Sequence, residues 1–212
     1  FKLRPVPRLS VIILNYDGRR WLPDCLDALR AQRDAPEFET LVVDNGSTDG
    51  SVDLVRTRYP DVRLIESAIN RGFAGGNNFG VSYAHAEWLI FLNNDTAADP
   101  RWLHELWKAH TAHPEFQVFA SRLVFMHDAS IVDSAGDGYL RAGGAFKHGH
   151  GASADRHAGS REVFGACGGA LMIRRDVFEA LGGFDERFFM QYEDVDLSYR
   201  ARLRGCRIFY AA

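Results

Sequence analysis

The sequence has few cysteines, no long apolar run and no excess of positive charge, and each of these absences excludes a class of protein. The three cysteines, Cys25, Cys167 and Cys206, are widely spaced and odd in number, which fits neither a disulfide framework nor a zinc site. We therefore expect free thiols in a reducing compartment. The formal net charge is −3 and the lysine and arginine residues are scattered, so we expect no nucleic-acid partner.

Membrane insertion is not expected from this sequence either. No apolar run approaches the roughly 18 residues of a transmembrane span, and the N-terminus lacks the organisation of a signal peptide. We expect a cytoplasmic protein with no integral membrane segment; peripheral association with the inner face of the membrane is compatible with this expectation. The 212 residues, 46% of them hydrophobic, suffice for the core of one domain.

Strand and helix patterns alternate through the first half of the chain. Apolar segments end in polar turns, and the residues between them show helical spacing, as Leu22, Leu26 and Leu29 do. This alternation predicts an α/β fold with a mostly parallel central sheet and helices on its faces. The predicted strands are residues 9–14, 40–43, 62–65 and 88–92.

The second half of the chain is less regular. We see no internal repeat and no linker, so residues 1–212 are expected to form a single domain. The pattern predicts strands near 119–124 and 139–146, a polar mobile loop over 147–160, helices over 175–181 and 192–204, and a final strand at 208–210.

One apolar run stops abruptly at Asn93, Asn94 and Asp95, whose side chains all carry oxygen atoms. The carboxyl ends of parallel strands are the places where open α/β sheets bind ligands. Asp95 can offer a hard oxygen ligand to Mg²⁺ or Mn²⁺, and the two amides can add neutral oxygens or hydrogen bonds. An ordinary polar turn after a strand is the alternative explanation.

Two further segments could contact a nucleotide. Residues 44–49 follow the second strand, so the Asp44 carboxylate can meet a ligand near exposed backbone amides; an Asx turn with a helix cap is the alternative. Residues 70–78 hold three glycines and match neither a P-loop nor a dinucleotide fingerprint, so a flexible loop is the alternative there. In either case we expect this loop to enter a helix that ends near His85.

Three acids gather at the start of the helix predicted for residues 192–204. The helix dipole tends to keep acids ionised there, and an ionised carboxylate can act as a general base. Acids are also ordinary residues of a first helical turn. Asp194 and Asp196 diverge by about 200° on a helix, so they cannot both point into one pocket.

Other candidate nucleophiles and ligands are weaker. No nucleophile elbow is present for Ser/His/Asp catalysis, and Cys167 is expected to be buried rather than reactive. The histidines of the central helix and of the polar loop are expected to be solvated; they are His104, His110, His113, His148, His150 and His157.

Taken together, five segments resemble the family-2 inverting glycosyltransferases of the GT-A fold, most closely the rhamnosyltransferase-like and galactofuranosyltransferase-like branch. They are VIILNYDG at 11–18, VVDNGSTDGS at 42–51, NRGFAGGNN at 70–78, FLNNDT at 91–96 and GGFDERFFMQYEDVDLSYRARLRG at 182–205. The match covers nearly the whole chain. The resemblance implies a nucleotide-binding half over about residues 1–100 and an acceptor-binding and catalytic half over about residues 101–212.

The resemblance also implies roles for individual residues. Glu193 and Asp194 match the family's acidic pair, with Asp194 as the catalytic base. Asp95 matches the retained carboxylate of the Asp-x-Asp metal motif, which implies Mg²⁺ or Mn²⁺ as cofactor, and Asn93 replaces the first acid of that motif. The residues implied to bind the nucleotide are Asn15, Asp44, Asn45, Gly72, Gly75, Asn77 and Asn94, with Asp44 facing the imide of the base; Gly168 and Gly169 would approach the sugar or acceptor.

The implied function is the inverting transfer of a sugar from a UDP- or dTDP-sugar, dTDP-rhamnose among them, to a hydroxyl of a glycan or lipid-linked acceptor, as in cell-surface polysaccharide biosynthesis. Family members usually continue to a histidine that completes the metal site, so we expect a C-terminally truncated chain. The alternative function is a nucleotide-diphosphate-binding module without catalysis. A nucleotidyltransferase would need a Gly-rich loop with arginine and lysine directly after the first strand, and residues 15–18 are not that loop.

Overall fold

The computed structural model describes residues 6–212, and its strand β1 (Leu9–Asn15) has a parallel neighbour on each side. These neighbours are β2 (Phe38–Asp44) and β4 (Trp88–Asn93), and β3 (Arg63–Glu66) pairs in parallel with β2. These are the four strands predicted for the first half of the chain, with ends that differ by a few residues.

The register of these strands brings the predicted polar clusters together. Asn15 is the partner of Asp44 across β1 and β2, and Leu14 is the partner of Asn93 across β1 and β4. The carboxyl ends of β1, β2 and β4 therefore lie at one edge of the sheet, which we call the carboxyl edge.

The second half of the chain adds four strands to the same sheet. They are β5 (Val118–Ser121), β10 (Arg161–Val163), β11 (Ala170–Arg174) and β12 (Ile208–Ala211). The order across the sheet is β10-β12-β5-β11-β4-β1-β2-β3, and β11 is antiparallel to both of its neighbours. Four of the seven strand pairs are parallel, so the prediction of a mostly parallel sheet is confirmed.

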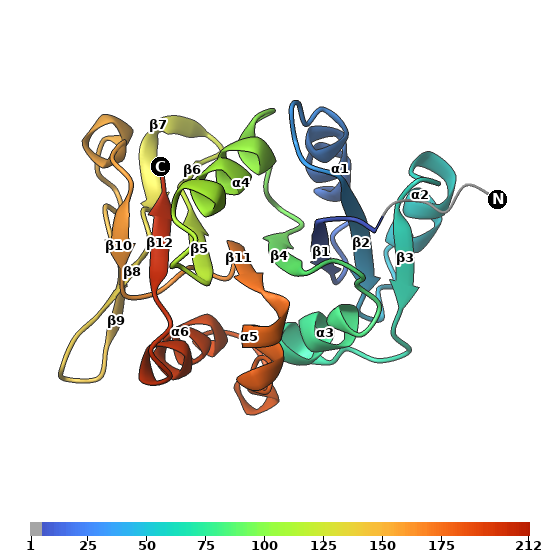
Figure 1. The fold of residues 1–212 in the computed structure, drawn as a ribbon. Coiled ribbons are helices and arrows are strands. Elements are labelled where there is room, and N and C mark those ends of the chain that lie inside the picture. The colour runs from blue at the N-terminus through green and yellow to red at the C-terminus, as the bar shows by residue number, and fades with distance from the viewer. Residues whose placement is uncertain (1–5) are drawn as a thin grey trace.

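Helices cover both faces of the sheet, as predicted, because alternate side chains of each strand point to opposite faces. Ile13 packs in the core on one face and Ile12 in the core on the other. The face with Ile13 carries α1 (Leu22–Arg30), α2 (Ser51–Arg58) and α4 (Trp102–Ala112). The face with Ile12 carries α3 (Gly72–Val81), α5 (Arg175–Ala180) and α6 (Glu193–Leu203) (Figure 1).

No helix within residues 6–212 combines the length and apolarity needed to span a membrane.

Residues 139–146 do not form the single strand that was predicted. The chain turns within them, because Leu140 and Gly144 close a tight loop whose Leu140 N–H donates to the Gly144 carbonyl at 2.7 Å. Two short strands result, β8 (Asp137–Tyr139) and β9 (Ala145–Lys147), which pair as an antiparallel hairpin that projects from the sheet beside α6 (Figure 1).

The segment between β9 and β10 contains more structure than the predicted loop. One turn of 3₁₀ helix spans Ala154–His157. The neighbouring backbone also pairs with β7 (Asp128–Ser134), which itself forms a hairpin with β6 (Leu123–Phe125). In particular, the Val132 N–H donates to the Ala152 carbonyl at 2.9 Å.

The prediction of a glycine-rich loop over residues 70–78, leading to a helix that ends near His85, was wrong. These residues are largely helical, since α3 begins at Gly72 and already ends at Val81. Its glycines let the helix lie close to the sheet: a Cβ at Gly76 would collide with the Leu14 side chain, and one at Gly80 would lie 2.6 Å from Val43 Cγ2. Packing against β1 and β2 therefore outweighs the low helix propensity of glycine.

Candidate active site at the carboxyl edge

The ends of β1 and β2 hold the Asp44 carboxylate between two donors. Asn15 Nδ2 donates to Asp44 Oδ1 at 3.2 Å, and the backbone N–H of Ser47 donates to Asp44 Oδ2 at 3.0 Å. Asn15 and Asp44 are 0% and 4% exposed. A carboxylate can accept about four hydrogen bonds, so Asp44 retains capacity for a further donor such as the imide N–H of a base.

Asn15 also connects this carboxylate to the end of β4. Its Oδ1 atom accepts a hydrogen bond of 2.8 Å from Asn94 Nδ2, so both polar groups of the Asn15 amide are used within the carboxyl edge. The neighbouring Gly18 lies against these two side chains, and a Cβ at that position would collide with both. The two clusters predicted from the sequence, around Asp44 and around Asn94, are therefore parts of one hydrogen-bond network.

Residues 168–169 join the end of β4 to the start of α6. The Asn93 N–H donates to the Gly169 carbonyl at 3.0 Å, and the Gly168 N–H donates to Asp194 Oδ2 at 2.7 Å. Asp194 is thus fixed beside the Asn93–Asp95 segment, although it lies about a hundred positions later in the chain. Asp196 instead pairs with Arg200 at 2.6 Å, as the divergence of the two acids predicts.

Two buried acids next to Asp194 hold protons more tightly than ordinary carboxyls. Burial raises the pKa of Glu193 to about 7, and Glu193 Oε2 is buried without a hydrogen-bond partner among residues 6–212. Burial, and then the charge of Asp194, raise the pKa of Asp137 to about 7. Perturbed acids of this kind cluster at functional sites.

Asp137 was not predicted from the sequence. It lies in the three-residue strand β8, within a small polar segment that resembles an ordinary turn. Only its tertiary environment marks it: the side chain is 6% exposed, and Asp137 Oδ1 accepts a hydrogen bond from Ser134 Oγ at 3.3 Å.

Two asparagines predicted to bind the nucleotide are occupied by protein partners. Asn45 is 1% exposed, and its Nδ2 atom donates to Asn70 Oδ1 at 2.9 Å and to the Gly72 carbonyl at 3.1 Å. Asn77 is also 1% exposed and donates to the Phe73 carbonyl at 3.0 Å. The Asn45 bonds join the end of β2 to the start of α3, whereas the Asn77 bond stays within α3.

The predicted glycines of α3 are likewise close to protein atoms. Gly72 has a φ of +71°, and a Cβ there would collide with the Phe189 carbonyl oxygen. The same carbonyl accepts a hydrogen bond of 2.6 Å from the Phe73 N–H. A Cβ at Gly75 would lie 3.4 Å from Glu186 Oε2. These contacts join α3 to the segment that precedes α6, and the roles of Gly72 and Gly75 toward a nucleotide stay predictions.

The histidine and cysteine predictions had different outcomes. His110 is not solvated as expected, because its ring centre lies 4.3 Å from that of Trp88 and 4.9 Å from that of Trp107. Partial burial lowers the pKa of His110, which favours the neutral form of the ring. Burial raises the pKa of Cys167 to about 12, which fits the expectation of an unreactive thiol.

A cavity of about 490 Å³ adjoins the Asp44 network at the carboxyl edge. Asp17 connects the two, because its backbone N–H donates to Ser47 Oγ at 3.0 Å and Ser47 Oγ in turn accepts from Asn15 Nδ2 at 3.1 Å. The residues that line this cavity are Asp17, Arg19, Arg20, Pro23, Asp49 and Leu54.

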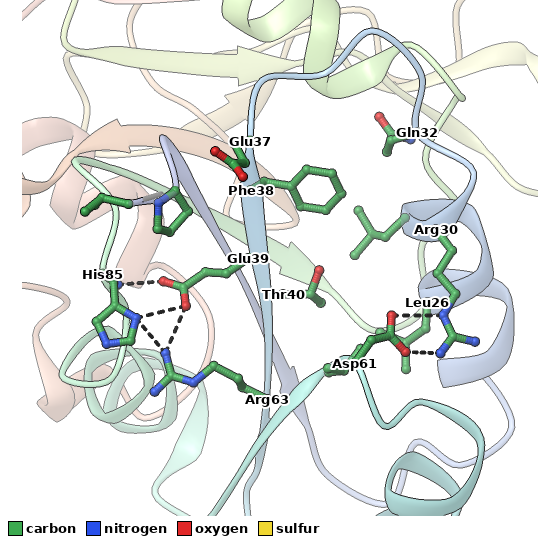
Figure 2. Close-up of a pocket in the computed structure, with 14 residues that line it drawn as sticks. Leu26, Arg30, Gln32, Glu37, Phe38, Glu39, Thr40, Asp61, Arg63 and His85 are labelled. Atoms are coloured by element: carbon green, nitrogen blue, oxygen red, sulfur yellow. Dashed lines mark hydrogen bonds and ion pairs between the residues drawn. The ribbon is translucent and has the colours of Figure 1, made fainter. Parts of the chain in front are cut away.

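A larger cavity, of about 1080 Å³, lies near the amino ends of β2 and β3. Figure 2 shows Glu39 there between Arg63 and His85, with Arg63 donating to Glu39 Oε2 at 2.9 Å. None of the predicted site residues lines either cavity. Position favours the smaller cavity and its surroundings, because it adjoins the Asp44 network and α/β sheets bind ligands at the carboxyl ends of their strands.

Asp95 could hold a divalent metal ion at this edge. Its side chain is exposed, and Asn93 and Asn94 supply neutral oxygens beside it. Residues 6–212 contain no group of three or more His, Cys, Asp or Glu side chains placed to hold a metal. Mg²⁺ is commonly held by one or two carboxylates together with substrate phosphates, so this donor set fits a site that a diphosphate completes.

Comparison with known proteins gives a consistent assignment. Residues 10–182 match the model of the family described as glycosyl transferase family 2. The chain is 32% identical to the O-antigen biosynthesis protein RfbC of Myxococcus xanthus over 100% of this chain and 17% of that protein. It is 29% identical to the N-acetylglucosaminyl-diphospho-decaprenol L-rhamnosyltransferase of Mycobacterium tuberculosis over 93% of this chain and 71% of that enzyme. The chain thus spans only a small part of the RfbC length.

A solved structure has the same fold. The structure of GalNAc-T7 with UDP, GalNAc and Mn²⁺ superposes with a TM-score of 0.76 over 98% of this chain and 43% of that one, at 13% sequence identity. At this level of identity the likeness concerns the fold, and it confirms the predicted GT-A architecture.

Proposed function

The chain belongs to glycosyl transferase family 2, and from that premise we propose that it is an inverting glycosyltransferase that moves a sugar from a UDP- or dTDP-sugar to a hydroxyl group of a glycan or lipid-linked acceptor. The observation that carries the proposal is the continuous set of contacts from Asp44 through Asn15 to Asn94, together with the Gly168–Gly169 segment that connects β4 to Asp194. A nucleotide-recognition group and a candidate base are thereby held at one edge of one sheet.

The donor class follows from the chemistry of Asp44. A carboxylate can accept a hydrogen bond from the imide N–H of uracil or thymine, whereas the ring nitrogen of neutral cytosine carries no proton. The complex of GalNAc-T7 contains UDP, and a relative from Mycobacterium tuberculosis is named as an L-rhamnosyltransferase, which makes dTDP-rhamnose one donor to test. That relative's name also specifies a diphospho-decaprenol acceptor, which supports a lipid-linked acceptor.

In the proposed mechanism Asp194 accepts the proton of the acceptor hydroxyl as that oxygen attacks the anomeric carbon. Its Oδ1 and Oδ2 atoms each accept one backbone hydrogen bond, from Val195 and Gly168, which orients the carboxylate and leaves further lone pairs for the proton. The attack from the face opposite the leaving diphosphate inverts the anomeric configuration. Asp95, with Asn93 and Asn94 beside it, would hold Mg²⁺ or Mn²⁺, which when bound neutralises the charge of the diphosphate.

Burial raises the pKa values of the acids Asp137 and Glu193, and both lie close enough to Asp194 for its charge to raise them further. Close to pH 7 each carboxyl with a pKa of about 7 is protonated in roughly half of the molecules. A neutral carboxyl can donate a hydrogen bond, so both residues can either donate to or accept from a sugar hydroxyl.

The proposal is tested by incubating the chain with a panel of UDP- and dTDP-sugars, with and without Mn²⁺, and with glycan and polyprenyl-diphosphate acceptors. NMR of the product then reports the anomeric configuration. We expect transfer from a UDP- or dTDP-sugar with inversion. If nucleotides bind but neither transfer nor hydrolysis is detected for any donor, the nucleotide-diphosphate-binding module is favoured instead. Retention of the anomeric configuration would reject the mechanism.

A further inference from the structure

Three aromatic rings meet where the β8–β9 hairpin lies against α6. The centre of the Tyr139 ring is 5.1 Å from that of Phe164, with an interplanar angle of 19°, and 5.3 Å from that of Tyr199. Phe164 and Tyr199 are 6.2 Å apart. Tyr199 is 42% exposed, so this aromatic cluster is open to solvent on at least one side.

The cluster shares a strand face with a buried acid. Asp137 and Tyr139 are two residues apart on β8, so their side chains leave the same face of the hairpin, about 7 Å apart along the strand. Lys147 is the cross-strand partner of Asp137 and belongs to that face as well. The opposite face is already filled, because the Phe146 ring lies directly over Gly138.

Backbone contacts connect this strand face to the proposed base. Asp137 and Gly165 exchange two backbone hydrogen bonds, of 2.8 and 3.0 Å. The next residue along the chain, Ala166, donates its N–H to Ser198 Oγ at 3.2 Å. Two residues further on, Gly168 holds Asp194. The same short segment therefore positions Phe164 of the cluster at one end and the Asp194 carboxylate at the other.

The combination of groups suits a sugar ring. A pyranose has C–H bonds that can lie on an aromatic face and hydroxyl groups that a carboxyl can bind, and aromatic residues supply a large apolar area beside a polar handle. Asp137 is 6% exposed, and within the described part of the chain its carboxyl has one hydrogen bond to a side chain, from Ser134, so it keeps capacity for a hydroxyl group.

We propose that Tyr139, Phe164 and Tyr199, together with Asp137, form a subsite that stacks and orients a sugar ring of the acceptor. The inference rests on the proposed function, because it assigns the side from which the acceptor reaches Asp194. The donor sugar is expected elsewhere, next to the diphosphate and Asp95 at the end of β4. The subsite therefore determines which acceptor sugar is used and leaves nucleotide binding unchanged.

Saturation-transfer NMR tests the subsite without knowledge of the natural acceptor. The probes are the methyl pyranosides of glucose, galactose, rhamnose and N-acetylglucosamine, each added to the intact chain. We expect saturation of the ring C–H protons of at least one probe, reduced at least fivefold by Tyr199→Ala and retained by Tyr199→Phe, which keeps the ring. Tyr83→Ala is the matched control, because Tyr83 is 39% exposed, packs on Phe79 and lies in the turn after α3, outside the aromatic cluster.

Two results would overturn the subsite. One is saturation that survives in Tyr199→Ala or is absent for all four probes; the other is displacement of the bound probe by a UDP- or dTDP-sugar, which would place the rings in the donor site. Calorimetric titration of the same variants with UDP and dTDP distinguishes failure of the subsite from failure of the proposed function. If nucleotides bind and the pyranosides do not, the subsite fails alone.

Discussion

The Gly168 N–H donates a hydrogen bond of 2.7 Å to Asp194 Oδ2, and a Cβ at Gly168 would lie 3.3 Å from the Asp194 Cβ. Glycine at this position therefore lets the backbone come within hydrogen-bond distance of the carboxylate without crowding it. The contact connects two roles that the resemblance implies, an approach to the acceptor by Gly168 and proton abstraction by Asp194. A carboxylate oriented in this way is suited to a single proton transfer.

Substitution of Asp194 tests that role. Asp194→Asn keeps the shape of the side chain but removes its ability to take a proton, and general-base assistance is typically worth about 10²–10⁴ in rate. We expect transfer to fall at least roughly 100-fold while UDP or dTDP binding is unchanged. Asp196→Asn is the control, since Asp196 pairs with Arg200 and not with Gly168. Near-normal turnover of Asp194→Asn would reject the base assignment.

Substitution of Asp95 separates metal binding from catalysis. Because Asp95 is the carboxylate in the Asn93–Asp95 segment, Asp95→Ala removes the one charged oxygen donor of that segment. We expect Mn²⁺ to increase the calorimetric affinity for UDP or dTDP in the wild type and to have at least tenfold less effect in Asp95→Ala. Asp155→Ala, at an exposed acid in the 3₁₀ turn, should behave like the wild type. An unchanged metal effect in Asp95→Ala would place the ion elsewhere.

The two buried acids predict how stability depends on pH. Asp137 and Glu193 have their pKa values raised to about 7 in the folded chain, from 3.8 and 4.5, so between about pH 4 and 7 the folded state binds more protons than the unfolded state. The contribution of these two carboxyl groups to stability is therefore greatest below about pH 4 to 5, and this contribution is lost as the pH rises through 7. A tenfold change in a proton-binding constant between the folded and unfolded states corresponds to about 1.4 kcal/mol, so the effect is measurable by urea unfolding.

Variants identify the groups responsible for this pH dependence. Asp137→Asn and Glu193→Gln each remove one buried carboxyl, so the unfolding free energy should fall less between pH 5 and pH 8 than it does in the wild type. Glu179→Gln on α5 is the control, since that side chain is 58% exposed. If both buried variants lose as much stability over this range as the wild type, the raised pKa values are not responsible.

The sequence predicts the strands and the carboxyl-edge residues well because both depend on local patterns. Apolar runs that end in polar turns identified β1, β2 and β4, and parallel pairing then brought Asn15, Asp44 and the start of the Asn93–Asp95 segment together. Asp137 could not be predicted, for the opposite reason. Its burial is supplied by residues distant in the chain, among them Gly165, and no local spacing records that contact.

The helix over residues 72–81 could not be predicted from local propensity for a similar reason. Glycine disfavours a helix in an isolated chain, and only the approach of α3 to β1 and β2 offsets that loss. A second tertiary contact satisfies amides at the start of α3, because the Phe73 and Ala74 N–H groups donate to the Phe189 carbonyl. Both features are tertiary, so the sequence pattern alone suggested a loop over residues 70–78 and a helix only after it.

Gly80→Ala tests whether close packing is what the glycines of α3 provide. Alanine should favour the helix by about 0.8–1.0 kcal/mol over glycine. Its Cβ, however, would lie 2.6 Å from Val43 Cγ2 and 2.9 Å from Ile12 Cγ2, and such overpacking typically costs about 1–3 kcal/mol. We therefore expect net destabilisation by urea unfolding. The control is Gly159→Ala, where the added Cβ meets no atom within 4 Å and the change should stay within about 0.5 kcal/mol. A Gly80→Ala chain as stable as the wild type would mean that α3 can move away from the sheet, and the packing explanation of its glycines would have to be abandoned.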